Sequence, residues 1–434
     1  MKIAIWGYGR YGRRMFESLT RFCSDDYEVV CVYDKAYQKL KKTEGKVSLL
    51  IRNPEELPED YTKGLFEKVL LCIFFASDRL KNILRENSIP ELHLGSPEDL
   101  YPISSFEQGK KPFEINREGY DFYVIKNLCG AMANYESYEN LFLFNGEGKV
   151  VKEHRDRFNL NLENYYCYDY PFVFRQSKAE KIFLAGQYCI LTRIHSGNYW
   201  HFTYNNLDAV WLLEKAGFKG KYVVPEQEFC KEVLYMLDIS PERIIPLQNF
   251  EHNKIYIFEE VFTVAFNGAH ELYSTPVLLE EADYIKKKLP VDQSLPKKIY
   301  VKRIGKRKLL GADEILAAYG FTTVIPENYS VREQMTLFYN ADIVFCVHGA
   351  NSTNCLYMRK DTVFVEAFSS YWINPCNLCT VVATGIHYLP VSPLQTVFKN
   401  EERMNKDFEL PEALLRTTIR NAFLIFRGAV KEQG

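Results

Sequence analysis

The chain has 434 residues, of which 47% are hydrophobic, so it is long enough for two or three domains with sizeable cores. Its formal net charge of -2 at pH 7 gives no strong positive field, which argues against a nucleic-acid-binding protein. No apolar run approaches the roughly 20 residues of a transmembrane helix, and the first residues are typical of a strand rather than a signal peptide. We therefore expect a cytoplasmic protein without a membrane span; peripheral attachment to the inner face of the membrane is left open.

Eleven cysteines are scattered along the chain without a regular framework. An odd number without paired spacing predicts reduced thiols, as in a cytosolic protein. Cys376 and Cys379 have no second pair at zinc-site spacing, and they fall in a helical pattern. We therefore expect both thiols to pack in a core, and we predict no metal site.

The first segment has the pattern of a dinucleotide-binding fold. A predicted strand over 2–6, a glycine-rich turn, a helix and a second predicted strand over 28–33 follow one another. The motif residues are Gly7, Gly9, Gly12 and Asp34. Such glycines permit a tight turn and a close backbone approach to a pyrophosphate, and such an acid accepts a hydrogen bond from a ribose hydroxyl. Residues 1–115 are therefore predicted to form a Rossmann-like nucleotide-binding module with a parallel sheet. A bound nucleotide or NAD and a purely structural module are both left open.

Residues 116–290 alternate predicted strands and helices, and we expect them to form a second α/β domain. Apolar and aromatic strands are predicted over 141–144, 181–184 and 189–193. A Tyr-Trp-His cluster at 199–201 then opens a helical stretch that ends at Gly217, which is a helix C-terminal signal.

Residues 291–395 contain the clearest alternation of strands and helices. The predicted strands cover 299–302, 322–325, 343–347, 362–367 and 387–391. One of the intervening helices starts with a capping box formed by Ser330 and Glu333. This order predicts a parallel doubly wound sheet, in which ligands bind at the carboxyl ends of the strands. Residues 396–434 are expected to form a C-terminal helical tail that packs back across the domains.

One stretch of this block, from His348 to Asn354, has the features of an anion site. It follows a buried apolar strand and leads through Gly349 into hydroxyl and amide side chains. The first N–H groups of a helix lack intrahelical partners, and the helix dipole favours negative charge there. An ordinary strand–loop–helix connection is the alternative when this pattern is taken alone.

The motifs of this region resemble glycosyltransferase family 61. The matching residues are Arg303, Pro326-Glu327-x-x-Ser330-x-x-Glu333-Gln334, Ala341-Asp342, His348-Gly349-Ala350-x-x-Thr353-Asn354, Glu366-x-Phe368 and Asn374, with Asn198-Tyr199-Trp200-His201 upstream. The resemblance covers residues 121–393 and excludes the glycine-rich module. It implies a GT-B-like pair of Rossmann-like domains, with residues 116–290 on the acceptor side and residues 291–395 binding the nucleotide-sugar donor. It also implies inversion at the anomeric carbon and no obligatory metal. The chain departs from the family pattern at Asn351 and Ser352, where small aliphatic residues are usual, and this leaves the donor preference open.

Several strand-end and loop residues are candidates for donor binding. The set is Arg303, Glu333, His348, Gly349, Ala350, Thr353, Asn354 and Glu366. Arg303 suits a bidentate phosphate contact, and the hydroxyl and amide residues of the loop lie where N–H groups would meet phosphate oxygens. His348 is interpreted as a donor to the diphosphate or the sugar, and Glu366 as an acceptor from ribose hydroxyls. Simple helix capping, and a carboxylate satisfied by the protein itself, are the structural alternatives.

The acceptor hydroxyl must lose its proton, and His201 is the first candidate for the general base. An imidazole titrates near neutral pH, although a packed, hydrogen-bonded histidine fits the same pattern. Asp208 is the second candidate, about two turns along the same helix face. His195, together with Arg193, could shape the acceptor cleft. The chain contains no Asp-x-Asp motif, which argues for cationic and helix-dipole stabilisation of the diphosphate instead of a metal clamp.

These observations predict an enzyme, a hexosyl- or pentosyltransferase that is inverting and metal-independent. It would move a sugar from a nucleotide-diphosphate sugar, with UDP favoured, to a hydroxyl of a glycan acceptor in surface or capsular polysaccharide synthesis. Transfer would require no cofactor. The alternatives are an NAD-dependent oxidoreductase or nucleotide-sugar-modifying enzyme that uses the Gly7–Gly12 site, and a non-catalytic nucleotide-binding scaffold. The donor sugar, the acceptor, the linkage and homo-oligomer formation are left open.

Overall fold

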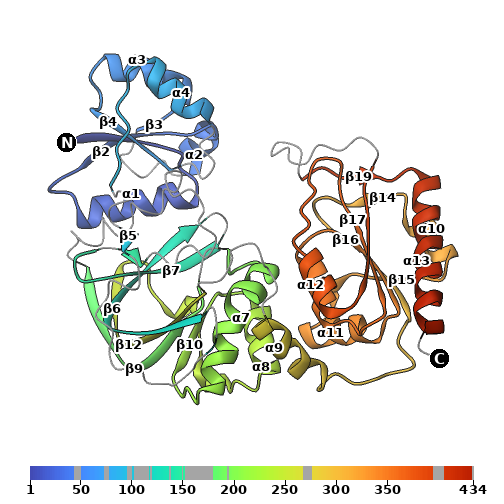
Figure 1. Ribbon diagram of the computed structural model, residues 1–434. Coiled ribbons are helices and arrows are strands. Elements are labelled where there is room, and N and C mark those ends of the chain that lie inside the picture. Colours follow the sequence, from blue (N-terminus) through green and yellow to red (C-terminus); the bar gives the residue numbers. More distant parts are fainter. Residues whose placement is uncertain are drawn as a thin grey trace. The chain divides into compact units, whose positions relative to one another are not determined.

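The computed structural model describes residues 1–43, 50–72, 78–94, 100–101, 117, 120–135, 138–148, 150–151, 179–192, 195–266, 276–393 and 405–432. This part of the chain is a mixed α/β protein with several parallel sheets (Figure 1). Contacts divide it into two compact units. The first contains the described residues of 1–195 with 220–225 and 245–266, and the second contains 196–219, 226–244 and the described residues from 276 onward. Within residues 116–290, this division assigns most strands to the first unit and the helices to the second. The domain boundaries expected from the sequence remain untested.

A four-stranded parallel sheet forms the N-terminal part of the first unit. Its strands are β1 (Lys2–Trp6), β2 (Glu28–Tyr33), β3 (Leu50–Arg52) and β4 (Lys68–Leu71), in the order β3-β2-β1-β4. The accompanying helices are α1 (Arg10–Phe22), α2 (Tyr37–Thr43), α3 (Leu57–Thr62) and α4 (Asp78–Glu86). Alternate side chains of β1 pack in two different hydrophobic cores. Ile3 and Ile5 pack with α1, whereas Ala4 and Trp6 pack with α3 and α4. The sequence predicted β1 and β2 with these bounds.

A larger mixed sheet completes the first unit, in the order β11-β10-β9-β12-β6-β7-β8-β5. The strands are β5 (Leu100–Tyr101), β6 (Tyr120–Tyr135), β7 (Tyr138–Phe144), β8 (Val150–Val151), β9 (Glu180–Ile190), β10 (Lys221–Val224), β11 (Ile244–Pro246) and β12 (Lys254–Phe266). Strand β12 pairs antiparallel with β6 and parallel with β9. The prediction of two strands over 181–184 and 189–193 is corrected: β9 is continuous, because Gly186 at a φ of 100° absorbs an irregularity opposite β12 without ending the strand. Arg193 lies outside the described residues.

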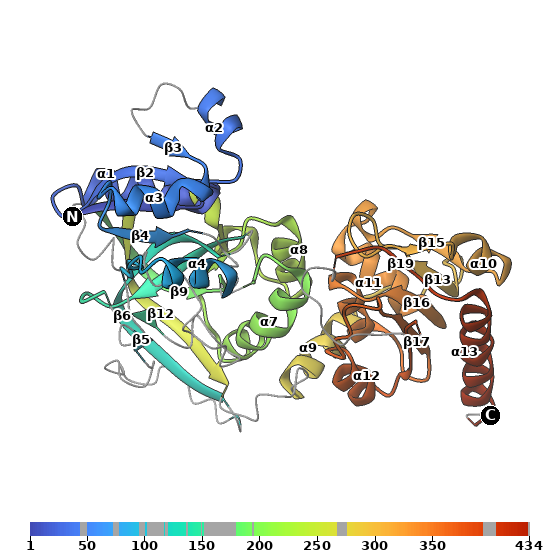
Figure 2. The ribbon, with the colours of Figure 1, turned by 90° about the horizontal axis from the view of Figure 1, so that it is seen from above.

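The second unit contains the parallel sheet that the sequence predicts for residues 291–395. Its order is β15-β13-β16-β17-β18, and its strands are β13 (Lys298–Val301), β15 (Thr322–Val324), β16 (Ile343–Val347), β17 (Val363–Ala367) and β18 (His387–Val391). Helices cover both faces, as Figures 1 and 2 show. One face packs against α10 (Asp313–Ala318) and α13 (Glu412–Glu432). The other face packs against α11 (Val331–Asn340), α12 (Leu378–Thr384) and the 3-10 helix η9 (Ala350–Tyr357). Two short strands, β14 (Leu309–Leu310) and β19 (Phe408–Glu409), pair beside it.

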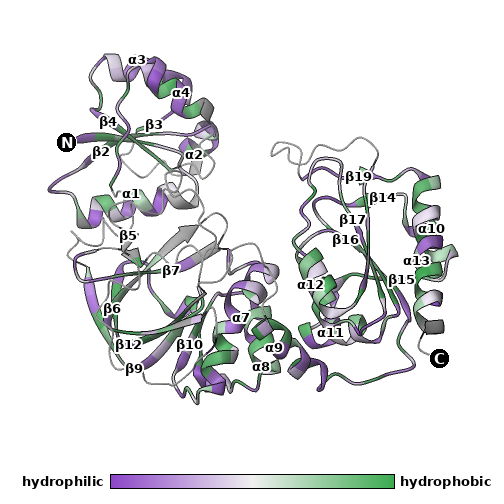
Figure 3. Ribbon diagram, viewed as in Figure 1, coloured by the Kyte–Doolittle hydropathy of each residue, from purple (hydrophilic) through white to green (hydrophobic). Residues whose placement is uncertain are grey.

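Strand β16 is apolar throughout because both of its faces are covered. Phe345 packs in the core with α10 and α13, whereas Val344 and Cys346 pack in the core with α11. Helix α13 buries Leu415 and exposes Leu424, and Figure 3 shows hydrophobic and hydrophilic residues alternating along it. The described contacts place α13 on this sheet, and packing of the tail across the domains stays a prediction.

Three further helices belong to the second unit: α7 (Tyr199–Lys215), α8 (Glu228–Met236) and α9 (Pro276–Lys286). Helix α7 is buried along most of its length and packs against α9 and η9.

The predicted capping box at the start of α11 is confirmed, since the Ser330 hydroxyl accepts from the Glu333 N–H while the Glu333 carboxylate accepts from the Ser330 N–H at 2.8 Å. Among the described residues, no helix is long and apolar enough to cross a membrane.

Candidate functional site

The candidate site lies at the carboxyl edge of the parallel sheet in the second unit. Arg303 follows β13, His348 follows β16, and Glu366 is the penultimate residue of β17. Glu366 lies in register with Cys346 on β16 and Pro390 on β18. Because the strands are parallel, their ends meet at one edge, which is where open α/β sheets bind ligands.

Glu366 is fully buried, and its carboxylate is held by three side chains. Oε1 accepts from Asn377 Nδ2 at 2.8 Å and lies 2.8 Å from His348 Nδ1, while Oε2 accepts from the Tyr388 hydroxyl at 2.7 Å. Burial, together with this carboxylate, raises the pKa of Tyr388, which therefore remains a donor. A buried charge is tolerated when it is hydrogen-bonded in this way. The network shows that Glu366 orients His348, a contact that the sequence did not predict.

The His348 ring is fixed from two directions. It stacks on Phe368 with ring centroids 4.9 Å apart and an interplanar angle of 29°, and its Nδ1 faces Glu366. An imidazole whose Nδ1 donates to a carboxylate presents Nε2 on its other side. The pair therefore sets the tautomer and orientation of a histidine at the strand edge.

Arg303 is bound to the backbone of the same edge. Its Nη1 donates to the His348 carbonyl at 3.0 Å, and its Nε donates to the Lys306 carbonyl at 2.6 Å. The guanidinium occupies the space beside Gly349, where an added Cβ would lie 1.6 Å from Nη1. The glycine of the His348-Gly349 pair is thus required by the close approach of Arg303.

A second arginine, Arg307, lies near the first, and no motif in the sequence marked it as a site residue. Burial, together with the charge of Arg303, lowers the pKa of Arg307 to about 10. Within the described ranges, neither guanidinium forms an ion pair with a carboxylate, and Arg307 Nε is buried without a hydrogen-bond partner. Two cations held together in this way favour an anion between them. The signal in the sequence was the second arginine, four residues after Arg303.

The loop after β16 continues as the 3-10 helix η9. Its buried residue Ser352 donates to the Gly349 carbonyl at 2.5 Å and accepts from Asn377 Nδ2 at 2.8 Å. Thr353 Oγ1 is buried and has no partner among the described residues. Asn354 instead links helices, since it accepts from the Tyr199 hydroxyl at 2.8 Å and donates to Gln334 at 3.2 Å. Ala350, the first residue of η9, is half-buried at the same edge.

The first turn of α7 lies against this loop. Asn198 caps the helix, accepting from the Trp200 N–H at 3.0 Å, and the bond from Tyr199 to Asn354 ties this turn to η9. His201 belongs to the same turn, and its Nδ1 lies 3.2 Å from Asn205 Nδ2. The structure therefore brings the predicted base near the residues of the loop.

Asp208, the second candidate base, lies inside the packing of α7 and α9. Its Oδ1 accepts from the N–H of the next residue at 2.8 Å, and the side chain is buried. The facing residue Glu281 on α9 is fully buried, and neither of its carboxylate oxygens has a partner in the described part of the chain. Burial, reinforced by the Asp208 charge, raises the pKa of Glu281 to about 8. This buried pair of acids was not predicted, because its members are distant in sequence.

Two other candidates have contacts of their own. Glu333 acts in the capping box, and hydrogen bonds from Ser330 lower the pKa of its carboxyl. His195 belongs to the first unit and has a positive φ of 60°.

Cys376 and Cys379 are both free thiols. In the described ranges, no group of three or more His, Cys, Asp or Glu side chains could hold a metal ion, and metal-independent transfer stays a prediction.

The glycine-rich turn of the N-terminal sheet is braced by Asp34. Its Oδ2 accepts from the Tyr8 N–H at 2.7 Å, and its Oδ1 accepts from the Ala36 N–H at 2.8 Å. An added Cβ at Gly12 would lie 1.9 Å from the Gly7 carbonyl oxygen, so the turn and α1 pack too closely for a side chain. Gly9 is the N-cap of α1. Nucleotide binding by this turn stays a prediction.

A comparison with protein families identifies the chain as a glycosyltransferase. The matching family is described as Glycosyltransferase 61, and the match covers residues 199–365. This segment begins at the first turn of α7 and includes Arg303, Arg307 and His348. The match confirms the resemblance found in the sequence over these residues, and it does not include the N-terminal sheet. A search of curated proteins found no match.

Proposed function

We propose that the enzyme transfers a sugar from a nucleoside diphosphate sugar to a hydroxyl of a glycan acceptor, with inversion and without a metal. The observation that carries this proposal is the pair of guanidiniums at the carboxyl edge, Arg303 and Arg307, in a segment that matches a glycosyltransferase family. Sugar transfer separates a diphosphate from the anomeric carbon, and negative charge grows on the leaving oxygen. Cations that are already in place stabilise this charge without reorganisation.

His348 is proposed to donate a hydrogen bond to the leaving diphosphate or to the sugar. Its Nδ1 donates to Glu366, so Nε2 is the atom assigned to the ligand, and Nε2 donates only when both ring nitrogens carry a proton. Glu366 is thereby a positioning residue, because its oxygens are engaged by His348, Asn377 and Tyr388. This replaces the expectation that Glu366 contacts the ribose hydroxyls directly.

His201 is proposed as the general base. Inversion requires the acceptor oxygen to attack opposite the leaving group while a base removes its proton. The proton is assigned to Nε2. A free lone pair on Nε2 requires Nδ1 to carry the ring proton, so we assign the Asn205 amide the orientation in which its oxygen accepts from Nδ1–H; with Nδ2 toward Nδ1, Nε2 would be protonated and could not act as the base. Asp208 is the weaker candidate because its buried carboxylate already accepts from the Ala209 N–H.

The two-domain GT-B-like architecture, UDP as the nucleotide and a role in capsular or other surface polysaccharide synthesis also remain proposals. They rest on the family resemblance, and the parallel five-stranded sheet of the second unit is compatible with the donor half of such a pair. A possible homo-oligomer and a cytoplasmic location are kept as expectations from the sequence.

A binding panel tests the proposal. Purified protein is titrated by calorimetry with UDP, GDP, CMP and NAD, and then incubated with UDP-sugars to detect released UDP. We expect UDP to bind and the Arg303→Ala variant to bind it about tenfold or more weakly, a loss of roughly 1.4 kcal/mol. Equal affinity in wild type and variant would remove the arginine pair from the donor site.

The N-terminal sheet supports a second candidate, a nucleotide or NAD site. The parallel order β3-β2-β1-β4 and the close approach of Gly12 to Gly7 are both compatible with dinucleotide binding. In the same panel, NAD binding that survives Arg303→Ala would support an oxidoreductase or a separate nucleotide site. Binding of none of the four nucleotides would favour the scaffold.

A further inference from the structure

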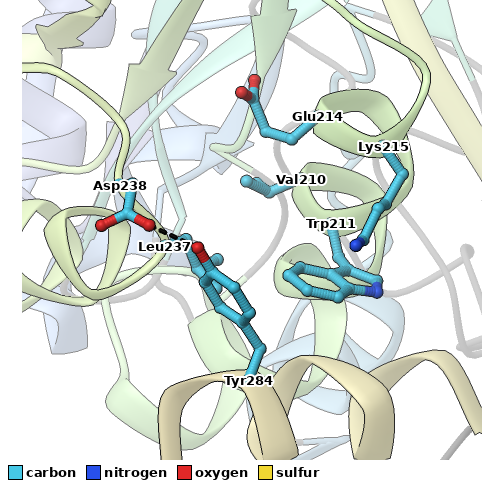
Figure 4. A pocket seen from close by; sticks show the side chains of 7 residues that line it. All are labelled: Val210, Trp211, Glu214, Lys215, Leu237, Asp238 and Tyr284. Atoms are coloured by element: carbon cyan, nitrogen blue, oxygen red, sulfur yellow. Dashed lines mark hydrogen bonds between the residues drawn. The ribbon is translucent and has the colours of Figure 1, made fainter. Parts of the chain in front are cut away.

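A pocket of about 230 Å³ lies in the second unit, away from the strand edge. It is formed by the second half of α7, the end of α8 and α9, and Figure 4 shows its side chains. The lining residues are Val210, Trp211, Glu214, Lys215, Leu237, Asp238 and Tyr284. Drug-sized ligands occupy pockets of roughly 300–1,000 Å³, so this pocket suits a single ring rather than a whole nucleotide sugar.

Two aromatic rings form one wall of the pocket. Trp211 and Tyr284 have centroids 5.0 Å apart and an interplanar angle of 52°. The Lys215 ammonium lies 4.5 Å from the Trp211 centroid, and the Lys288 ammonium lies 4.1 Å from the Tyr284 centroid. Because an ammonium group of the protein already lies over one face of each ring, the pocket is not an aromatic cage for a cationic ligand.

Two carboxylates line the same pocket, and both are fixed by cations. Glu214 forms two parallel hydrogen bonds with Arg243, at 2.7 and 3.0 Å. Asp238 Oδ2 accepts from Lys288 at 2.6 Å and from the Tyr284 hydroxyl, and Figure 4 shows the latter contact. Among the described residues Asp238 Oδ1 has no such partner. These fixed acceptors disfavour an anionic ligand and suit one that donates hydrogen bonds.

A neutral ring that carries hydroxyls satisfies all of these conditions. Its C–H face can pack on Trp211 and Tyr284, and its hydroxyls can donate to Asp238 and Glu214. Val210 and Leu237 supply the apolar part of the lining. We propose that this pocket is a glycan subsite that binds one neutral sugar ring.

The subsite is separate from the candidate catalytic groups. Trp211 lies ten residues beyond His201 on the same helix, which corresponds to about 15 Å along the axis. A ring bound here therefore belongs to a part of the acceptor chain that is remote from the reacting hydroxyl. This assignment of the ring to the acceptor rests on the proposed function, whereas the binding of a sugar ring does not.

Saturation-transfer NMR on the full chain tests the subsite. The probes are the methyl glycosides of glucose, galactose, mannose, N-acetylglucosamine and xylose, each titrated with and without saturating UDP. We expect at least one glycoside to bind and its signal to persist with UDP. Tyr284→Ala and Asp238→Asn should each weaken binding by about tenfold. Asparagine suits position 238 because its φ of 61° is one that Asn tolerates.

Phe183→Ala is the matched control, since this aromatic residue is 56% exposed on β9 of the first unit. It should bind the glycoside as the wild type does. The subsite would be overturned if no glycoside gave a saturation-transfer signal with the wild type, or if UDP displaced the glycoside. It would also be overturned if the two pocket variants bound the glycoside as tightly as the wild type does. UDP binding is measured in the same samples, so failure of the donor site and failure of the subsite are distinguishable.

Discussion

The guanidinium of Arg303 occupies the position where a side chain at residue 349 would begin. A Cβ on Gly349 would lie 1.6 Å from Arg303 Nη1 and 2.9 Å from its Cζ. The backbone of Gly349 is extended, with a φ of 165°, so any residue could adopt this conformation. Glycine is required here by the neighbouring arginine alone, and this makes Gly349 a probe of the proposed diphosphate site.

Gly349→Ala should displace the end of the Arg303 side chain and leave the fold intact. The clashing atoms are the flexible tip of that arginine, which can move without disturbing the strand. We expect UDP affinity to fall by about tenfold or more, with an unchanged melting temperature. Calorimetry and thermal unfolding measure the two effects.

Gly428→Ala is the control for this substitution. Gly428 lies in α13, and no atom lies within 4 Å of an added Cβ. Alanine there should stabilise the helix by roughly 0.5–1 kcal/mol and leave UDP affinity unchanged. If Gly349→Ala binds UDP as tightly as Gly428→Ala does, Arg303 is not a donor-binding residue.

Arg307→Met should weaken UDP binding because it removes one of the two cations. We expect a loss of about tenfold to a hundredfold, and a smaller dependence of affinity on salt concentration than in the wild type. Arg332→Met on the exposed face of α11 is the control. Calorimetry at two ionic strengths measures both variants, and identical salt dependence in all three proteins would exclude Arg307 from the anion site.

We expect the free energy of unfolding to fall as the pH rises, because of the buried carboxyl of Glu281. Burial raises its pKa from 4.5 to about 8, with Asp208 adding to the shift, so between these values the folded state keeps a proton that the unfolded state has lost. This contribution is fully present below pH 4.5 and is lost as the pH rises to about 8, with a slope of up to about 1.4 kcal/mol per pH unit. Glu281→Gln should flatten the dependence.

The other groups near Glu281 do not reproduce this effect. Tyr199 and Tyr357 keep their protons, because burial raises the pKa of both hydroxyls, and Lys286 opposes the shift of Glu281. Glu280→Gln, at an exposed neighbouring position, is the control and should keep the wild-type slope. Urea unfolding at several pH values between 5 and 9 is the measurement. A wild-type slope in Glu281→Gln would show that this carboxyl is ionised in the folded protein.

His201→Ala should abolish sugar transfer while UDP affinity stays within about twofold of wild type, because the proposed base acts on the acceptor and not on the donor. Transfer is measured as UDP release in the presence of acceptor, and affinity by calorimetry. His93→Ala, at an exposed histidine of the first unit, should retain full activity. Full turnover by His201→Ala would transfer the role of base to another group.

The sequence determined the parallel sheet of residues 291–395 because its signals are local. Strand β16 is a continuous apolar run, since both of its faces are buried, and the capping box of α11 involves residues three apart. The long strands β6 and β12 were not predicted, because their antiparallel pairing joins segments more than a hundred residues apart. Asp208 and Glu281 are also distant in sequence, and their burial side by side was not predicted.

Only the tertiary structure decided which strand-end groups are paired. The sequence placed Arg303, His348 and Glu366 at one edge because parallel strands end together. It did not show that three side chains satisfy Glu366, that Arg303 packs against Gly349, or that Arg307 lies beside it. Such contacts depend on side-chain directions and on residues brought from other elements, and periodicity along the chain carries no information about either.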